Sequence, residues 1–240
     1  MSETKQSTIR IAAVGDIHFG ENDTGRYQEQ LKDIANHADV FVICGDLTQN
    51  GHAKEAQVLA DELKYCRIPV IGILGNHDYD KDEDAAIRDV LRPVMRLLDE
   101  EPYVLEGVGF AGTKGFGGGF GGYTLAAFGE SATKAFVHEA VEESLHLEKA
   151  LSRLEANKKV VVLHYAPIPE TLKGEAPEIF PFLGSSRLAD PIDTFGADLI
   201  IHGHAHHGSP KGQTNKGIPV HNVALAQLED PKKPYITFEI

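Results

Sequence analysis

The chain has 240 residues, of which 42% are hydrophobic, so it is long enough to bury a full core as a single domain covering 1–240. Its formal net charge of −13 would repel polyanions, which argues against a long nucleic acid as a partner. The two cysteines, the polar N-terminal segment and the lack of a bilayer-spanning apolar run lead us to expect a cytoplasmic protein with no membrane partner.

The first part of the chain alternates apolar, strand-like runs with amphipathic segments. We predict strands at 9–14, 40–44 and 71–74 and helices at 26–37, 53–65 and 84–98, the last kinked near Pro93. This alternation is typical of parallel strands joined by helical crossovers. Cys44 and Cys66 lie in or beside these elements, and we interpret both as packing residues rather than metal ligands.

The pattern changes near residue 103. Short strands at 103–105 and 108–111, joined by Glu106-Gly107, predict a hairpin at which the sheet turns antiparallel. The glycine-rich segment 112–122 follows. It is either a flexible connection or a loop whose backbone amides and Lys114 contact a phosphate, although no Gly-Lys-Ser/Thr closes it as in a P-loop.

A long segment at 165–190 dominates the last part of the chain. It contains several prolines and the apolar cluster Ile179, Phe180, Phe182 and Leu183. Structureless segments of this length in a compact domain are usually functional, and this one leaves directly from His164. We predict a lid that contacts the substrate, and the alternative is a surface loop folded back on the core. The remaining predicted elements are a helix at 136–154 and closing strands at 220–225 and 235–240.

Five apolar strands each end in side chains that can bind a metal ion. These are Asp16 and His18 after 9–14, Asp46 after 40–44, Asn76, His77 and Asp78 after 71–74, His164 after 160–163, and His204 and His206 after 199–201. Ligands bind at the carboxyl ends of strands in open α/β sheets, so we expect these five ends to build one pocket. Carboxylate, imidazole and amide donors without a thiolate favour Mn, Fe, Zn or Co over a cysteine-rich zinc site.

The order of these residues resembles the signature of the metallophosphoesterase (calcineurin-like phosphoesterase) superfamily, which runs Asp-x-His, Gly-Asp, Gly-Asn-His-Asp/Glu, His and Gly-His-x-His. The match extends from Asp16 to His206. It implies an α/β fold, an α/β/β/α sandwich of mixed sheets with the active site at the carboxyl ends of the strands. It also implies two divalent metal ions, one held by Asp16, His18 and His206, the other by Asn76, His164 and His204, with Asp46 bridging both.

The resemblance further implies a mechanism. A hydroxide that bridges the two ions would attack the phosphorus of a small phosphorylated substrate in line. His77, which is not a ligand in the family pattern, would protonate the leaving oxygen. Asp78 would orient His77 or a ligand.

The sequence departs from one branch of the superfamily. Phosphoprotein phosphatases carry Gly-Asp-x-Val-Asp-Arg-Gly, whereas this chain has Gly-Asp-Leu-Thr-Gln-Asn-Gly at 45–51 and lacks that arginine. The segment is more similar to small phosphodiesterases that act on cyclic nucleotides and glycerophosphodiesters, which favours hydrolysis of a small phosphodiester.

A phosphomonoesterase is the alternative, with Lys114 or Arg187 as the extra cation. A non-catalytic scaffold would be expected to have lost ligands, and here the set is complete. The sequence leaves the oligomeric state open.

Overall fold

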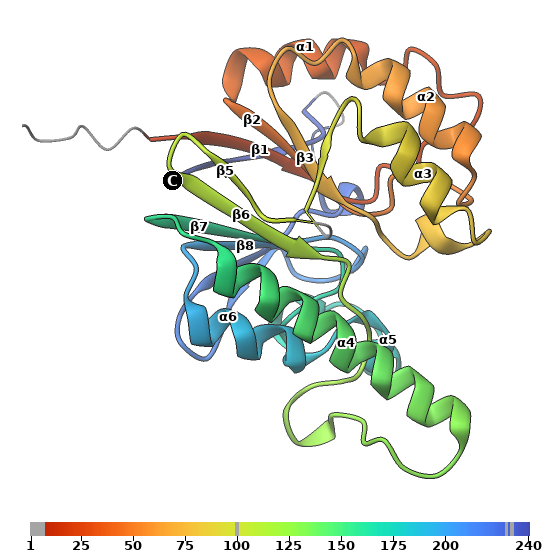
Figure 1. Ribbon diagram of the computed structural model, residues 1–240, viewed down its shortest axis with the longest axis vertical. Coiled ribbons are helices and arrows are strands. Elements are labelled where there is room, and N and C mark those ends of the chain that lie inside the picture. The colour runs from red at the N-terminus through yellow and green to blue at the C-terminus, as the bar shows by residue number, and fades with distance from the viewer. Residues whose placement is uncertain (1–7, 99–100, 229, 231–232) are drawn as a thin grey trace, which may run out of the picture.

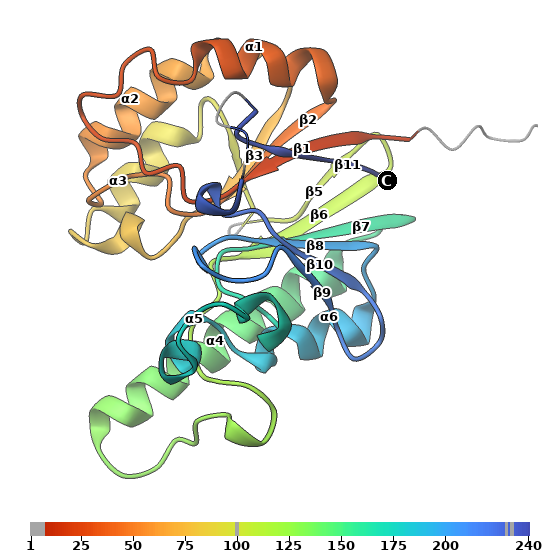
Figure 2. The ribbon, with the colours of Figure 1, turned by 180° about the vertical axis from the view of Figure 1, so that it is seen from behind.

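The computed structural model describes residues 8–98, 101–228, 230 and 233–240 as two β-sheets packed face to face with helices on both outer faces (Figure 1). Helices α1 (Gln28–His37), α2 (Ala53–Leu63) and α3 (Asp84–Leu91) lie on one side, and α4 (Ser131–Arg153) and α6 (Ala189–Phe195) lie on the other. The view from behind shows the same layers (Figure 2). This arrangement is the predicted α/β/β/α sandwich.

The first sheet comes from the N-terminal part of the chain and is completed by the C-terminal strand. Its order is β11-β1-β2-β3-β4, with β1 at Arg10–Val14, β2 at Val40–Cys44, β3 at Val70–Ile73, β4 at Arg96–Leu97 and β11 at Ile236–Glu239. Strands β1 to β4 are parallel, and β11 is antiparallel to β1. The carboxyl ends of β1, β2 and β3 therefore share one edge of the sheet, where their ligand-bearing loops begin.

The second sheet has the order β5-β6-β7-β8-β10-β9. Its strands are β5 (Tyr103–Leu105), β6 (Val108–Thr113), β7 (Lys158–Leu163), β8 (Leu199–His202), β9 (Lys211–Gln213) and β10 (Pro219–Asn222). The predicted hairpin is confirmed, since Leu105 pairs with Val108 between antiparallel β5 and β6. The sheet turns antiparallel at this hairpin, as predicted, and becomes parallel again after it, because β6, β7, β8 and β10 are parallel.

Alternate residues of the central strands enter different layers of the core. In β1, Ile11 and Ala13 pack between the two sheets, whereas Ala12 and Val14 pack against the helices of the first layer. All four side chains are fully buried. Strands buried on both faces appear in a sequence as continuous apolar runs, which explains why these were recognisable.

The predicted helix at 84–98 is wrong in its second half. Helix α3 ends at Leu91, and β4 at Arg96–Leu97 pairs in parallel with β3. Pro93 has no N–H for a helical hydrogen bond, and in a continued helix its ring would clash with the carbonyl of the preceding turn. The helix therefore ends ahead of the proline instead of continuing through a kink.

The segment 165–190 is not structureless. It contains the short helices η3 (Pro169–Leu172), η4 (Pro177–Ile179), α5 (Phe180–Leu183) and η5 (Ser186–Leu188), and α6 begins at Ala189. Ala166, Leu172 and Leu183 share a small core with Ala205, the residue between His204 and His206. The segment is therefore folded back onto the loop that carries two of the predicted ligands.

Two smaller differences concern the ends of elements, and a third is a strand that was not predicted. Helix α4 begins at Ser131 rather than at 136, and β10 ends at Asn222 and is followed by the short helix η6 (Leu225–Gln227). Strand β9 was not predicted, because Lys211–Gln213 has no apolar alternation. Among the helices of the described residues, none combines the length and the apolar character needed to cross a membrane.

Candidate metal centre

The loops after the strands turn sharply because several of their residues adopt left-handed backbone conformations. Asp16, His18, Asp46 and His204 have φ values of 59°, 44°, 50° and 67°. They are four of the six described non-glycine residues with positive φ, a conformation that is rare outside glycine and concentrated at functional sites. The sharp turns allow side chains from different strand ends to face one another.

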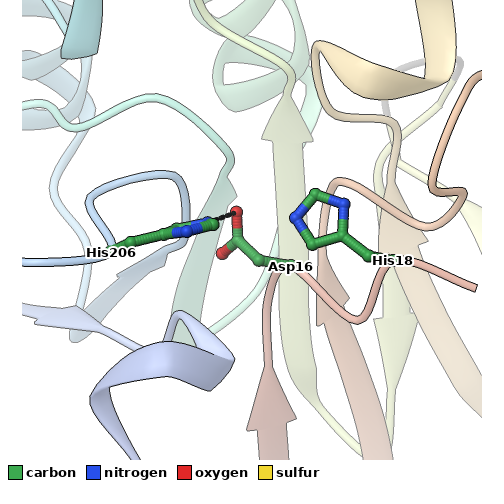
Figure 3. A group of neighbouring side chains, drawn as sticks. All are labelled: Asp16, His18 and His206. Carbon is green, nitrogen blue, oxygen red and sulfur yellow. Dashed lines mark hydrogen bonds and ion pairs between the residues drawn. The ribbon is translucent and has the colours of Figure 1, made fainter.

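Asp16, His18 and His206 form the first group of possible metal ligands (Figure 3). His206 Nε2 lies 3.1 Å from Asp16 Oδ1, and Figure 3 shows the rings of His206 and His18 on either side of the carboxylate. The backbone N–H of His204 donates to both carboxylate oxygens at 3.0 Å. The hydrogen bond to Asp16 raises the pKa of His206 against the opposing effect of burial.

A second group consists of Asp46, His164 and His204. His164 Nε2 lies 3.3 Å from Asp46 Oδ1 and 2.8 Å from Asn76 Oδ1. The ring centroids of His164 and His204 are 4.8 Å apart. Burial lowers the pKa of His204 to about 3, so its imidazole is neutral at physiological pH, as a metal ligand must be. The structure thus brings together the residues predicted to hold the second ion.

Asp46 lies between the two groups. Its Oδ1 faces His164, and its Oδ2 lies 3.8 Å from His18 Nε2. The backbone N–H of His77 donates to Oδ1 at 2.9 Å and fixes the carboxylate. Burial raises the pKa of Asp46, so its charged form needs a nearby cation. This is the position that a bridging ligand requires.

The surroundings of His164 show that the donor set fits a cation. His164 Nδ1 lies 2.9 Å from the carbonyl oxygen of Cys44, and we assign the ring proton to this nitrogen. Nε2 then presents a lone pair to Asn76 Oδ1 and Asp46 Oδ1, which also carry lone pairs. Such atoms repel one another unless a cation lies among them. The buried Nδ1 of His18 also has no hydrogen-bond partner within the described part of the chain.

His77 differs from these histidines in its exposure and its hydrogen bond. Its side chain is 37% exposed, and its Nδ1 lies 3.0 Å from the carbonyl oxygen of Gln49, which leaves Nε2 free to face a substrate. Burial lowers the pKa of His77, but the hydrogen bond to Gln49 and the charge of Asp46 outweigh burial and raise it. A raised pKa suits a proton donor. His77 also forms a third possible ligand group with His18 and Asp46, so ligation is the competing role.

Asp78 is fully buried and acts on the backbone of the ligand loops. Its Oδ2 accepts hydrogen bonds from the N–H groups of Leu47 and Gly75, at 3.1 and 2.8 Å. Its Oδ1 accepts from the N–H and the hydroxyl of Thr48, at 2.8 and 2.6 Å. Asp78 therefore ties the loop of Asp46 to the loop that contains Asn76. Asp78 is therefore a positioning residue, and its role in orienting His77 or a ligand stays a prediction.

The two cations considered for phosphate binding differ in how far they are engaged elsewhere. Lys114 is 7% exposed, its ammonium lies 3.1 Å from Glu143 Oε1, and it donates to the Gly115 carbonyl at 2.9 Å. Arg187 Nη2 lies 3.4 Å from the carbonyl oxygen of Leu125, but its buried Nε has no hydrogen-bond partner among the described residues. The alternative in which Lys114 contacts a phosphate is disfavoured, because its charge neutralises a carboxylate on α4.

The glycine-rich segment 112–122 is a packed connection. The N–H of Gly118 donates to the Pro181 carbonyl at 2.6 Å, and the N–H of Gly119 donates to the Gly184 carbonyl at 3.0 Å. These amides therefore bind the segment 165–190 instead of a phosphate.

Two residues that hold the ligand loops were missed in the sequence. Arg26 donates to the carbonyl oxygens of Ile17 and His18, at 2.8 and 3.2 Å, and so supports the loop that follows β1. Thr48 supports Asp78 through its hydroxyl. Thr48 could have been found from its place directly after the Gly-Asp motif, whereas Arg26 lies at the start of a predicted helix and has no distinguishing signal.

The chain matches the family model of calcineurin-like phosphoesterases over residues 9–208. It belongs to this family, as the order of its motifs predicted. The family consists of metal-dependent phosphoester hydrolases, and the His/Asp groups of the site agree with that class. The matched region contains all of the predicted ligands, from Asp16 to His206.

The individual proteins that this chain resembles share only a small part of its sequence. The glycerophosphodiester phosphodiesterase GpdQ of Enterobacter lignolyticus (strain SCF1) is 28% identical over 104 residues, which are 38% of this chain and 36% of that relative. The phosphopantetheinyl hydrolase of Mycobacterium tuberculosis has a TM-score of 0.66 and 15% identity over 95% of both chains. The protein TT1561 of Thermus thermophilus has a TM-score of 0.51 and 17% identity, over 90% of this chain and 89% of that one. At these identities the two solved structures show a shared fold alone.

Proposed function

We propose that this protein hydrolyses a small phosphodiester, of the cyclic nucleotide or glycerophosphodiester type, with two divalent metal ions at the candidate metal centre. The position of Asp46 carries the proposal, because its two oxygens face His164 on one side and His18 on the other. A carboxylate shared between two ligand groups suits a pair of ions better than one ion. The oxygen and imidazole donors suit Mn, Fe, Zn or Co.

Two observations support a diester rather than a monoester. A phosphate monoester carries more negative charge than a diester and gains more from an additional cation in the site. Lys114, which could have supplied such a cation, instead pairs with Glu143. The partial similarity to a relative named as a glycerophosphodiester phosphodiesterase points in the same direction.

The residues of the chain divide the work of the reaction between them. Ions bound in this centre would supply Lewis acidity and lower the pKa of a water molecule. His77 would donate the proton on its Nε2 to the leaving oxygen, because the Gln49 carbonyl holds the proton on Nδ1. Asp78 would keep the loops of Asp46 and Asn76 at a fixed separation, so that the ligands need no rearrangement during turnover.

A paired turnover assay tests the proposal. The protein is reconstituted with Mn²⁺ and given bis(4-nitrophenyl) phosphate, a diester, and 4-nitrophenyl phosphate, the corresponding monoester. We expect faster turnover of the diester, and loss of both activities after treatment with a chelator. Faster turnover of the monoester would favour the phosphomonoesterase alternative, and no turnover of either ester by the loaded protein would contradict the proposal.

A further inference from the structure

Four aromatic rings flank one side of the candidate metal centre, and we call Tyr165, Phe116, Phe136 and Phe182 the aromatic wall. The Tyr165 ring packs against the ring of His204, with 4.4 Å between centroids. Phe116 contacts Tyr165 at 5.8 Å and Phe136 at 4.8 Å, and Phe136 meets Phe182 edge-on at 5.9 Å. The wall therefore extends without interruption from a predicted metal ligand to the protein surface.

Phe182 is the exposed end of the aromatic wall, and its backbone holds it at the centre. The residue is 60% exposed, while its carbonyl oxygen lies 3.4 Å from His204 Nε2. Its neighbours are fixed, because the Pro181 carbonyl accepts a hydrogen bond from Gly118 and Leu183 is buried in a small core. A ring held in this way can stack on a bound group with little further loss of conformational freedom.

The other members of the apolar cluster predicted at 179–183 have different surroundings. Phe180 and Pro181 line a cavity of about 560 Å³, whose other walls come from 119–123, 167–170 and 213–215 and from α6. Leu183 is buried against Ala166 and Leu172. Within the cluster, Phe182 is therefore the member that combines a largely exposed side chain with a direct contact to the predicted ligand His204.

The flank of the centre that carries His18 is polar. A recess there is lined by His18, Gln49, Asn50 and His52 together with the acidic residues Glu21, Asp23 and Glu55, and the His77 ring packs against His18 at 4.7 Å. Amide and imidazole groups suit hydroxyls, whereas the aromatic wall suits a flat apolar group. The two flanks thus favour different parts of a substrate.

We propose that the aromatic wall is a specificity subsite that binds the aromatic group of a phosphodiester, such as a nucleobase, by stacking on Phe182. The inference rests on the proposed function and narrows its substrate class. Nucleotide-type diesters carry a flat π-face and glycerol-type diesters do not, so the wall selects the former. A base stacked on an aromatic side chain gains about 5- to 150-fold in affinity.

Calorimetric titration tests this subsite by binding as well as by turnover. The Mn²⁺-loaded protein is titrated with adenosine 5′-monophosphate and with glycerol 3-phosphate, which share a phosphate monoester and differ in the aromatic base. We expect the wild type to bind the adenosine compound about tenfold more tightly. Phe182→Ala should remove this preference and Phe182→Tyr should keep it. Phe128→Ala is the matched control, because Phe128 is 75% exposed and lies outside the aromatic wall.

Equal affinities in the wild type, or a preference that survives Phe182→Ala, would overturn the subsite. Loss of metal from Phe182→Ala, measured in the same samples, would also overturn it and give Phe182 a structural role in the centre. Turnover separates the two proposals. Hydrolysis of glycerophosphodiesters as fast as nucleotide diesters would keep the proposed function and remove the subsite. Preference for the adenosine compound, dependent on Phe182, in a protein that hydrolyses neither diester would remove the function and keep the subsite.

Discussion

Replacing Gly75 by alanine should disable the metal centre while leaving the sandwich folded. A Cβ added to Gly75 would lie 2.1 Å from Asp46 N and 2.2 Å from Asp46 Oδ1, whereas real Cβ contacts stay above 3.0 Å. Either Asp46 or the Gly75 backbone must therefore move by 0.9 Å, the difference between 3.0 and 2.1 Å. A shift of about 1 Å in a reactive site lowers activity by about 100-fold. Because Asp46 faces both ligand groups, we expect both ions to bind more weakly, by about 10- to 100-fold.

Gly122→Ala is the matched control, because a Cβ at Gly122 would meet no described atom within 4 Å. Three measurements are made on each variant: metal content after dialysis, turnover of bis(4-nitrophenyl) phosphate, and thermal unfolding followed by circular dichroism. We expect Gly122→Ala to match the wild type in all of them and Gly75→Ala to fold with depleted metal and low activity. A Gly75→Ala protein that retains two ions per chain and the wild-type rate would refute the reasoning.

Three further variants test individual roles. Asp46→Ala should lose both ions and the activity because this carboxylate faces both ligand groups, and full occupancy in elemental analysis would rule out bridging. His77→Ala should keep both ions. Its loss of activity should be greatest for diesters whose leaving groups have a high pKa, because these need the proton in the transition state. Its metal content and the leaving-group dependence of kcat decide this, and depleted metal would identify His77 as a ligand. Lys114→Met should lower the free energy of unfolding in a urea titration by about 3 kcal/mol, because Glu143 loses its buried partner, with KM for the diester unchanged. A higher KM at unchanged stability would instead support a contact between Lys114 and the substrate phosphate.

The strand ends were predictable because each follows an apolar run that is buried on both faces. His164 comes directly after such a run and Asp46 follows one after Gly45, and parallel pairing places each loop at the carboxyl edge of its own sheet. The face-to-face packing of the two sheets then brings these edges together (Figure 1). The roles of neighbours within one motif were harder to separate. His77 and Asp78 are adjacent, yet the short helix η1 (His77–Tyr79) leaves the His77 ring partly exposed and buries the Asp78 carboxylate. A turn of this length leaves no periodicity from which exposure could be inferred.

The errors came from contacts between residues that are distant in the sequence. Lys114 lies near the start of the glycine-rich segment 112–122, whereas its partner Glu143 lies on α4. No local sequence pattern links the two residues. The prolines of 165–190 correctly indicated breaks in regular structure, but they also begin short helices such as η3 and η4. Burial of Leu172 and Leu183 with Ala205 then holds these helices against the metal centre. That packing is a tertiary effect, which single-residue preferences do not contain.

The number of divalent ions bound per chain tests the two-ion centre most directly. Elemental analysis is made on the wild-type protein as purified and after reconstitution with Mn, Fe, Zn or Co. The complete ligand set around Asp46 predicts two ions per chain in at least one of these preparations. A chain that binds no stoichiometric transition metal in any of them, or that saturates at a single ion, would contradict the account.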